Sequence, residues 1–239
     1  MNLVVDAGNT RTKVGIFEGP RMQRKEVFQS FGEAILFVNA TEPENLLVSS
    51  VAVDGFETFS RTNVKGRKLQ LTPQLSTPVQ NKYETPHTLG TDRIAAACGA
   101  WSLFPHEASL VIDCGTCINY EFVNKRGEYR GGAISPGVSM RYTAMHQLTD
   151  RLPLASPDTD VPLTGVSTLE CLQSGVMNGV LEEINGITAR YRHDYPYIRV
   201  ILTGGDAHFF EKLMNPSIFV APDLVLMGLN SILLHNVNQ

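Results

Sequence analysis

The sequence lacks the features that would place the protein in a membrane or on nucleic acid. No apolar stretch approaches the roughly 20 residues needed to cross a bilayer. The first residues read directly as a strand, so we expect no signal peptide. The 20 basic residues are outnumbered by 24 acidic ones, giving a formal net charge of −4, whereas nucleic-acid surfaces are usually strongly basic. We therefore expect a cytoplasmic protein with no membrane or nucleic-acid partner.

Cysteine and histidine are few and do not have the spacing of metal ligands. The four cysteines fit reduced thiols better than a disulfide framework in a chain of 239 residues. Cys114 and Cys117 form one C-x-x-C pair, which leaves zinc or redox use open, but no second pair completes a four-ligand site. The six histidines are scattered, no Ser/His/Asp arrangement can be read, and the Walker A spacing is absent.

What the sequence does contain is a repeated strand–turn–strand pattern. LVVDAGNTRTKVGIF (residues 3–17) is echoed by LVIDCGTCINYEF (residues 110–122). Each copy has an apolar β-branched run, then Asp-x-Gly, then a second strand-like run. Glycine lets a backbone N–H approach a ligand, and the aspartate supplies a negative charge where a cation could sit. Either copy alone could be an ordinary hairpin turn, but two facing copies would clamp a polyphosphate and its metal.

The repeat predicts two halves, residues 1–108 and 109–239. Each half is expected to hold three strands, a helix, a further strand and a helix, which defines an α/β fold with mixed sheets and a cleft between the halves. Residues 72–90 and 153–164 are rich in proline and predict irregular connections, and the basic segment 61–68 predicts a solvated loop. The expected strands are 2–6, 12–17, 22–27, 45–50, 109–113, 117–123, 129–134 and 199–202, and the expected helices are 31–38, 91–103, 137–150, 167–193 and 223–235.

Three segments carry residue types suited to phosphoryl transfer, which mainly needs donors and cations around the phosphates. The first turn offers N–H and hydroxyl donors and the charge of Lys13, which could equally be an ordinary strand lysine. Gly90-Thr91-Asp92-Arg93 opens a helix, where Thr91 or Asp92 could be the N-cap. Alternatively, Asp92 accepts a substrate hydroxyl proton and Arg93 clamps a carboxylate. Thr203-Gly204-Gly205 leaves room for a flat ligand or is a plain turn.

The ordered set DAGNTRTKVGIF, GTDR, IDCGT, GGAISPG and TGG resembles the type III pantothenate kinases of the acetate kinase, hexokinase and actin superfamily. The match runs from Met1 to about Gly205. The resemblance implies two similar actin/ribonuclease H-like halves, each a mixed sheet flanked by helices, with a cleft between them. It also implies ATP-dependent phosphorylation of pantothenate to 4′-phosphopantothenate, the first step of coenzyme A biosynthesis.

The resemblance also implies roles for individual residues. Asp92 matches the family's catalytic base, and Asp113 matches the site of a monovalent cation. Family members are homodimers that build the pantothenate pocket partly from the partner subunit, and they require Mg²⁺ plus K⁺ or NH₄⁺. The residues that match ATP-binding positions are Asp6, Ala7, Gly8, Asn9, Thr10, Arg11, Thr12, Lys13 and Thr116. Those that match pantothenate-binding positions are Tyr83, Gly90, Thr91, Asp92, Arg93 and Thr168, the last on a looser motif.

The second turn departs from the family pattern. Family members usually have a sequence like DxGTATT there, whereas this chain has Asp113-Cys-Gly-Thr-Cys-Ile-Asn119. The aspartate, glycine and threonine are kept, so we expect phosphate binding, but Cys117 and Asn119 leave the donor set open. Two further hypotheses stay open: a kinase of the same fold for another small hydroxyl or carboxylate acceptor, and an ATP-binding regulatory protein with little turnover.

Overall fold

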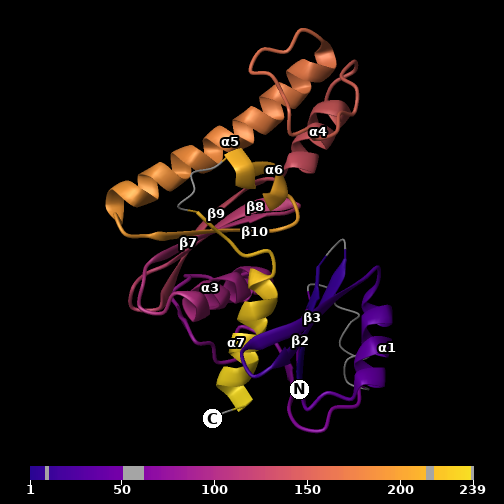
Figure 1. The fold of residues 1–239 in the computed structure, drawn as a ribbon, viewed down its shortest axis with the longest axis vertical. Helices are drawn as coiled ribbons and strands as arrows, with labels where there is room; N and C mark the ends of the chain where they lie inside the picture. The colour runs from indigo at the N-terminus through magenta and orange to yellow at the C-terminus, as the bar shows by residue number, and fades with distance from the viewer. Residues whose placement is uncertain (9–10, 51–61, 214–217, 238–239) are drawn as a thin grey trace. The chain divides into compact units, whose positions relative to one another are not determined.

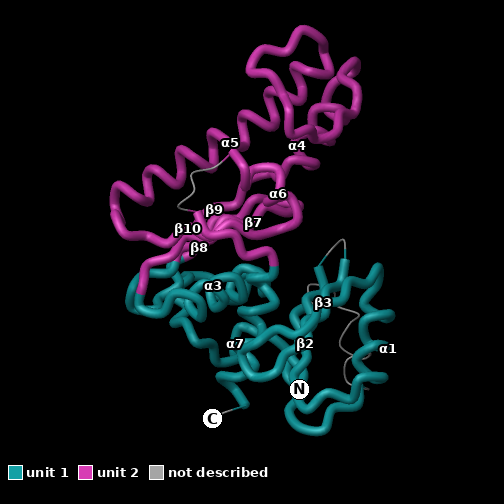
Figure 2. Tube along the Cα trace, viewed as in Figure 1, with its two compact units in different colours: residues 1–106, 123–130, 223–239 teal, residues 107–122, 131–222 magenta. Residues whose placement is uncertain are grey.

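The computed structural model of the protein describes residues 1–8, 11–50, 62–213 and 218–237 (Figure 1). Its contacts divide the chain into two compact units (Figure 2). The C-terminal segment 223–239, which the sequence division assigns to the second half, belongs to the first unit by its contacts. The boundary after residue 108 stays a prediction. Unit 1 comprises residues 1–106, 123–130 and 223–239, and unit 2 comprises residues 107–122 and 131–222.

Unit 1 contains a five-stranded mixed sheet in the order β3-β2-β1-β4-β5. β2 runs antiparallel to both β1 and β3, whereas β1, β4 and β5 are parallel. The central strand is apolar on both faces because both faces are covered. Leu3 and Val5 pack with helix α1 (Phe31–Thr41), and Val4 packs with helix α7 (Leu224–Val237). The strands are β1 Asn2–Ala7, β2 Thr12–Glu18, β3 Arg21–Phe28, β4 Asn45–Ser50 and β5 Lys68–Gln70.

The packing of two helices explains why the end of the chain returns to unit 1. Helix α3 (Thr91–Leu103) has small buried side chains, among them Ala95 and Ala97, which allow a close approach by another helix. Leu229 and Leu233 of α7 lie in the same core cluster as these alanines. Burying each leucine contributes about 1.5–3 kcal/mol, so this apolar face keeps α7 on unit 1.

The second sheet repeats the strand order of the first. Its order is β11-β10-β7-β8-β9-β6, so β9-β8-β7-β10-β11 corresponds to β3-β2-β1-β4-β5. β7, β10 and β11 are parallel. The additional strand β6 pairs with the first residues of β9, Glu128 and Tyr129, which are counted in unit 1. The strands are β6 Gln80–Asn81, β7 Ser109–Cys114, β8 Cys117–Val123, β9 Glu128–Pro136, β10 Arg199–Thr203 and β11 Phe219–Val220.

The core of unit 2 lies between its sheet and helix α5 (Thr168–Asp194), which is 27 residues long. Leu172, Val176, Val180 and Ile184 recur every four residues, so they form one buried face. Figure 1 shows this long helix together with α4 (Val138–Gln147) and the short α6 (Ala207–Phe210). In the described part of the chain, no helix is both long and apolar enough to cross a membrane.

The predicted fold class is confirmed, and each predicted strand and helix is present with small shifts at its ends. The proline-rich segment 72–90 is irregular apart from β6 and the 3₁₀ turn η1 (Pro86–Thr88). In the basic segment, residues 62–67 form no helix or strand, but Lys68 begins β5. Five short elements are not predictable from the sequence because they are too short to show a periodic pattern: β5, β6, β11, α6 and the 3₁₀ turn η2 (Glu211–Leu213).

Candidate active site

The first turn joins β1 to β2 in unit 1. The antiparallel register sets Asp6 directly opposite Lys13. Directly paired residues project from the same face of a sheet, so the carboxylate and the ammonium group are neighbours. Thr12 is buried, whereas Gly8 and Arg11 are exposed at the turn. Ala7, also predicted to bind ATP, is the buried last residue of β1. Asn9 and Thr10, the other two residues of that prediction, lie outside the described residues.

The Asp6 carboxylate is influenced electrostatically by both Lys13 and Asp92. Burial raises the pKa of Asp6 to about 6; the positive charge of Lys13 opposes this rise and the negative charge of Asp92 adds to it. Two residues that the sequence places more than eighty positions apart therefore come close enough to interact. The result is a pair of carboxylates beside one ammonium group, an arrangement that favours a bound cation and a phosphate together.

Asp92 lies in the first turn of helix α3, where its negative charge also suits the helix dipole. Its Oδ1 accepts a hydrogen bond of 2.9 Å from the backbone N–H of Arg93. The N-cap itself is Gly90, with no side-chain cap, so the alternative that Thr91 or Asp92 is the N-cap is wrong. Thr91 instead accepts a hydrogen bond of 2.8 Å from the hydroxyl of Ser49 on β4. The GTDR stretch is thereby attached to the sheet that carries the first turn.

Arg93 is held by aromatic packing. It is only 7 % exposed, and its guanidinium carbon lies 5.6 Å from the ring centroid of Tyr83. Tyr83 in turn stacks on Tyr129, with ring centroids 6.2 Å apart. The structure thus brings together Tyr83 and Arg93, both predicted to bind pantothenate. Tyr129 was missed by the sequence analysis, and its only signal was an aromatic residue just before Gly131-Gly132.

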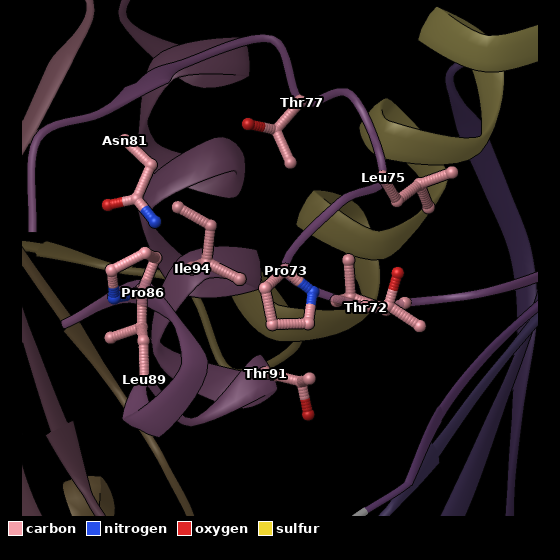
Figure 3. Close-up of a pocket in the computed structure, with 10 residues that line it drawn as sticks. Thr72, Pro73, Leu75, Thr77, Asn81, Pro86, Leu89, Thr91 and Ile94 are labelled. Atoms are coloured by element: carbon pink, nitrogen blue, oxygen red, sulfur yellow. The ribbon is translucent and has the colours of Figure 1, made fainter.

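A pocket opens beside Thr91 in unit 1 (Figure 3). Leu89 and Ile94 line it, together with Pro73 and Pro86 from the proline-rich segment. The described residues of its lining are apolar or carry uncharged polar side chains. Charged groups bind a polyphosphate most strongly, so this lining suits one poorly.

The second turn, between β7 and β8 in unit 2, is shorter than the first. The N–H of Gly115 donates to the carbonyl of Cys117 at 2.9 Å, which leaves Thr116 exposed at the tip. Asp113 lies at the end of β7, where β10 pairs Thr203 with it. A Cβ on Gly204, whose φ is +95°, would lie 2.5 Å from Oδ1 of Asp113. The Thr203-Gly204-Gly205 motif is therefore packed against Asp113 and requires glycine at its centre.

Asp206 is a second carboxylate near this turn that the sequence analysis missed. Its backbone N–H donates to the carbonyl of Cys114 at 2.9 Å, and burial raises the pKa of its side chain. The pKa of Cys114 is raised too, mainly by burial and then by Asp113 and Asp206, so this thiol stays neutral and unreactive. The signal in the sequence was an acidic residue directly after a strand and two glycines. All four cysteines are free thiols.

Thr168 is the first residue of helix α5 in unit 2, and it is exposed. The preceding Ser167 is the N-cap, since its hydroxyl accepts from the N–H of Glu170 at 3.3 Å. The Glu170 carboxylate accepts in return from the N–H of Val166, the residue before the N-cap, at 2.8 Å. Tyr83 and the GTDR stretch belong to unit 1, so the predicted pantothenate-binding residues are divided between the units.

Comparisons with solved structures define the class of the fold. A candidate N-acetylmannosamine kinase from Listeria monocytogenes is similar over 99% of both chains, with 14% identity and a TM-score of 0.51. A second similar structure is a protein from Campylobacter jejuni that is described as a candidate transcriptional activator of the Baf family. The alignment covers 99% of this chain and 100% of that chain. Its identity is 21% and its TM-score 0.69. The fold is that of the actin-like ATPases and sugar kinases.

Sequence comparisons identify the family within this class. The model of the type III pantothenate kinase family matches residues 2–190. A type III pantothenate kinase from Cytophaga hutchinsonii is 42% identical over 241 aligned residues, which cover 99% of this chain and all of that protein. The chain belongs to the type III pantothenate kinase family.

Proposed function

We propose that this protein transfers the γ-phosphate of ATP to the primary hydroxyl of pantothenate, which yields 4′-phosphopantothenate and begins coenzyme A biosynthesis. The supporting observation is that Asp6, Lys13 and Asp92 converge in unit 1 of a chain that belongs to the type III pantothenate kinase family over nearly its full length. A phosphate-binding turn and a carboxylate that can accept a proton are the two parts that this reaction needs.

In this proposal, Asp92 orients the pantothenate hydroxyl and accepts its proton late in the transfer. The transition state of phosphoryl transfer is loose, so the placement of the hydroxyl contributes more than the basicity of the carboxylate. Lys13 and the N–H groups of the first turn hold the phosphate oxygens. Arg93, whose guanidinium is fixed on Tyr83, binds the pantothenate carboxylate.

The proposed cofactors are Mg²⁺ and a monovalent cation, K⁺ or NH₄⁺. The partly buried Asp6 carboxylate beside Asp92 supplies the hard oxygen ligands that Mg²⁺ prefers. A bound Mg²⁺ would offset the charge of the phosphates. We place the monovalent cation at Asp113, next to Thr116, which contacts ATP. The carbonyl of Cys114 is a further oxygen on the same strand end.

We also propose that the protein is a cytoplasmic homodimer and that Thr168 contacts the pantothenate bound by the partner subunit. Apolar side chains around Thr168 support an interface there. Leu163 is 84% exposed, Val166 is 90% exposed and Leu169 is 47% exposed. An apolar patch of this kind is typical of a surface that another protein covers.

A coupled ADP-release assay with pantothenate, glucose and acetate, each with and without K⁺, tests the proposed reaction. We expect turnover with pantothenate alone and stimulation by K⁺. Turnover with glucose or acetate instead would assign another acceptor, and no turnover with any of the three would favour a regulatory ATP-binding protein. The net charge of −4 and the intact GTDR stretch favour the kinase over a DNA-binding regulator.

A further inference from the structure

The carboxylate of Glu183 on helix α5 connects strands β8 and β9 in unit 2. Its Oε1 accepts a hydrogen bond of 2.8 Å from the hydroxyl of Tyr120 on β8. Its Oε2 accepts one of 3.0 Å from the hydroxyl of Ser135 near the end of β9. Oε2 also forms an ion pair with the guanidinium of Arg141 on α4. Both oxygens are used, so Glu183 ties β8, β9 and α4 to α5.

Arg141 extends this network to the backbone that precedes α4. Its Nε donates to the carbonyl of Pro136 at 2.9 Å, and its Nη2 donates to Ser135 Oγ at 2.9 Å in addition to Glu183. These contacts use the planar, multiply donating geometry of a guanidinium, which the single ammonium group of a lysine cannot reproduce. The network therefore fixes the position of residues 135–136.

The segment fixed in this way rests directly on the second turn. The N–H of Gly137, the next residue, donates to the carbonyl of Thr116 at 3.1 Å. A Cβ on Gly137 would lie 2.2 Å from the carbonyl oxygen of Gly115, so the two backbones are in van der Waals contact without room for a side chain. Any displacement of residues 135–137 must therefore displace the tip of the turn.

The charges of the network are stabilised in place. Burial alone would raise the pKa of Glu183, but the hydrogen bonds from Arg141, Tyr120 and Ser135 lower it below its ordinary value, so the carboxylate is ionised at neutral pH. The side chain of Arg141 is 21% exposed and that of Glu183 is 23% exposed. Removing one partner leaves the others with unpaired polar groups in a partly buried site, which shifts the backbone they hold.

We infer that Glu183 and Arg141 are positioning residues for ATP: through Ser135, Pro136 and Gly137 they hold Thr116 where it meets the nucleotide. The inference rests on the proposed function, in which Thr116 contacts ATP. It requires that loss of the network weakens nucleotide binding and leaves pantothenate recognition unchanged. Tyr83 and Arg93 belong to unit 1, and Thr168 lies about four helical turns from Glu183 along α5.

The test measures the dissociation constant of a non-hydrolysable ATP analogue with Mg²⁺ by calorimetry, and the two KM values in the full-length protein. Glu183→Gln keeps the size of the side chain but removes the ion pair. Loss of one hydrogen bond to a charged group weakens binding by about 10-fold or more, so we expect a rise of about that size in the dissociation constant and in KM for ATP. KM for pantothenate should not change. Arg141→Lys should show the same pattern.

The matched control is Glu107→Gln, which removes the Arg199 ion pair elsewhere in unit 2. It should leave both KM values unchanged, with thermal unfolding measured for all variants. Weaker analogue binding by folded Glu183→Gln supports the inference. Unchanged binding, or equal weakening in Glu107→Gln, overturns it. Because binding of the analogue needs no acceptor, this result is independent of whether wild type phosphorylates pantothenate, and the assay with pantothenate tests that separately.

Discussion

The two Asp-x-Gly turns share a sequence pattern but differ in length and surroundings. The loop that joins β1, which ends at Ala7, to β2, which begins at Thr12, is longer than the loop that joins β7 to β8. Gly115 and Thr116 alone form this second loop. The first turn sets an aspartate opposite a lysine and near Asp92. The second sets Asp113 against the backbone of Gly204. In the proposed function the two copies have different roles: the longer copy, which carries Lys13, binds phosphate beside Asp92, and the shorter copy holds the monovalent cation.

Replacement of the Asp92 carboxylate should have the largest effect on kcat. Asp92→Asn keeps the size of the side chain but cannot accept the hydroxyl proton. Loss of a general base commonly costs about 10²–10⁴ in rate, so we expect kcat to fall by that factor while ATP still binds. Steady-state kinetics and calorimetry with ATP check this. Asp150→Asn, an exposed aspartate in unit 2, is the control and should retain wild-type kcat. Wild-type turnover by Asp92→Asn would refute the role of the base.

Lys13→Met should weaken ATP binding and change the pH dependence of the reaction. Asp6 titrates with a pKa of about 6, and Lys13 lowers that value. Activity that needs the ionised Asp6 should therefore fall as the pH drops through about 6 in wild type. Without the nearby positive charge the pKa of Asp6 rises, so the fall in activity should shift to higher pH. The profile of kcat/KM for ATP against pH measures the shift. Lys125→Met, at an exposed hairpin position, is the control and should leave the pH profile unchanged. A pH profile of Lys13→Met that is not shifted would contradict the pairing of Lys13 with Asp6.

Asp113→Ala should weaken the response to K⁺ more than it weakens catalysis at saturating K⁺. A carboxylate contributes charge to a cation site, and removing it lowers affinity, here by an expected factor of about 10. Titration of the rate with K⁺ gives the half-activating concentration. The same titration on Lys13→Met is the comparison, since the first turn should not govern K⁺. An unchanged K⁺ dependence in Asp113→Ala would contradict a cation site at the second turn.

Gly204→Ala should have the smallest effect on chemistry but a measurable effect on stability. Its φ of +95° disfavours any side chain, and the added Cβ would also lie 2.2 Å from the carbonyl oxygen of Cys114. Strain at such positions costs about 1–3 kcal/mol of unfolding free energy. Gly205→Ala meets nothing within 4 Å and should stay within about 0.5 kcal/mol of wild type. Urea denaturation of both variants decides whether Gly204 is fixed by contact with β7.

The sequence was sufficient for the elements with a strong local signal. The apolar run of β1 predicts a strand that is buried on both faces, and the alanine-rich pattern of α3 predicts a buried helix. Both patterns can be recognised from residues that are close together in the sequence. The electrostatic effect of Asp92 on Asp6 could not be derived in this way, since it depends on how β4 and α3 pack. The positions of Tyr129, Asp206 and Glu183 were missed for the same reason: each acts through a partner distant in sequence.

In the proposed reaction, the first turn and Asp92 direct the γ-phosphate of ATP to pantothenate. Phosphorus NMR of the protein with ATP, Mg²⁺, K⁺ and pantothenate tests it most directly, because the spectrum distinguishes a phosphomonoester from free phosphate. We predict that 4′-phosphopantothenate and ADP appear in equal amounts and that neither forms without pantothenate. Release of ADP with inorganic phosphate, at the same rate with and without pantothenate, would show that pantothenate is not the phosphate acceptor.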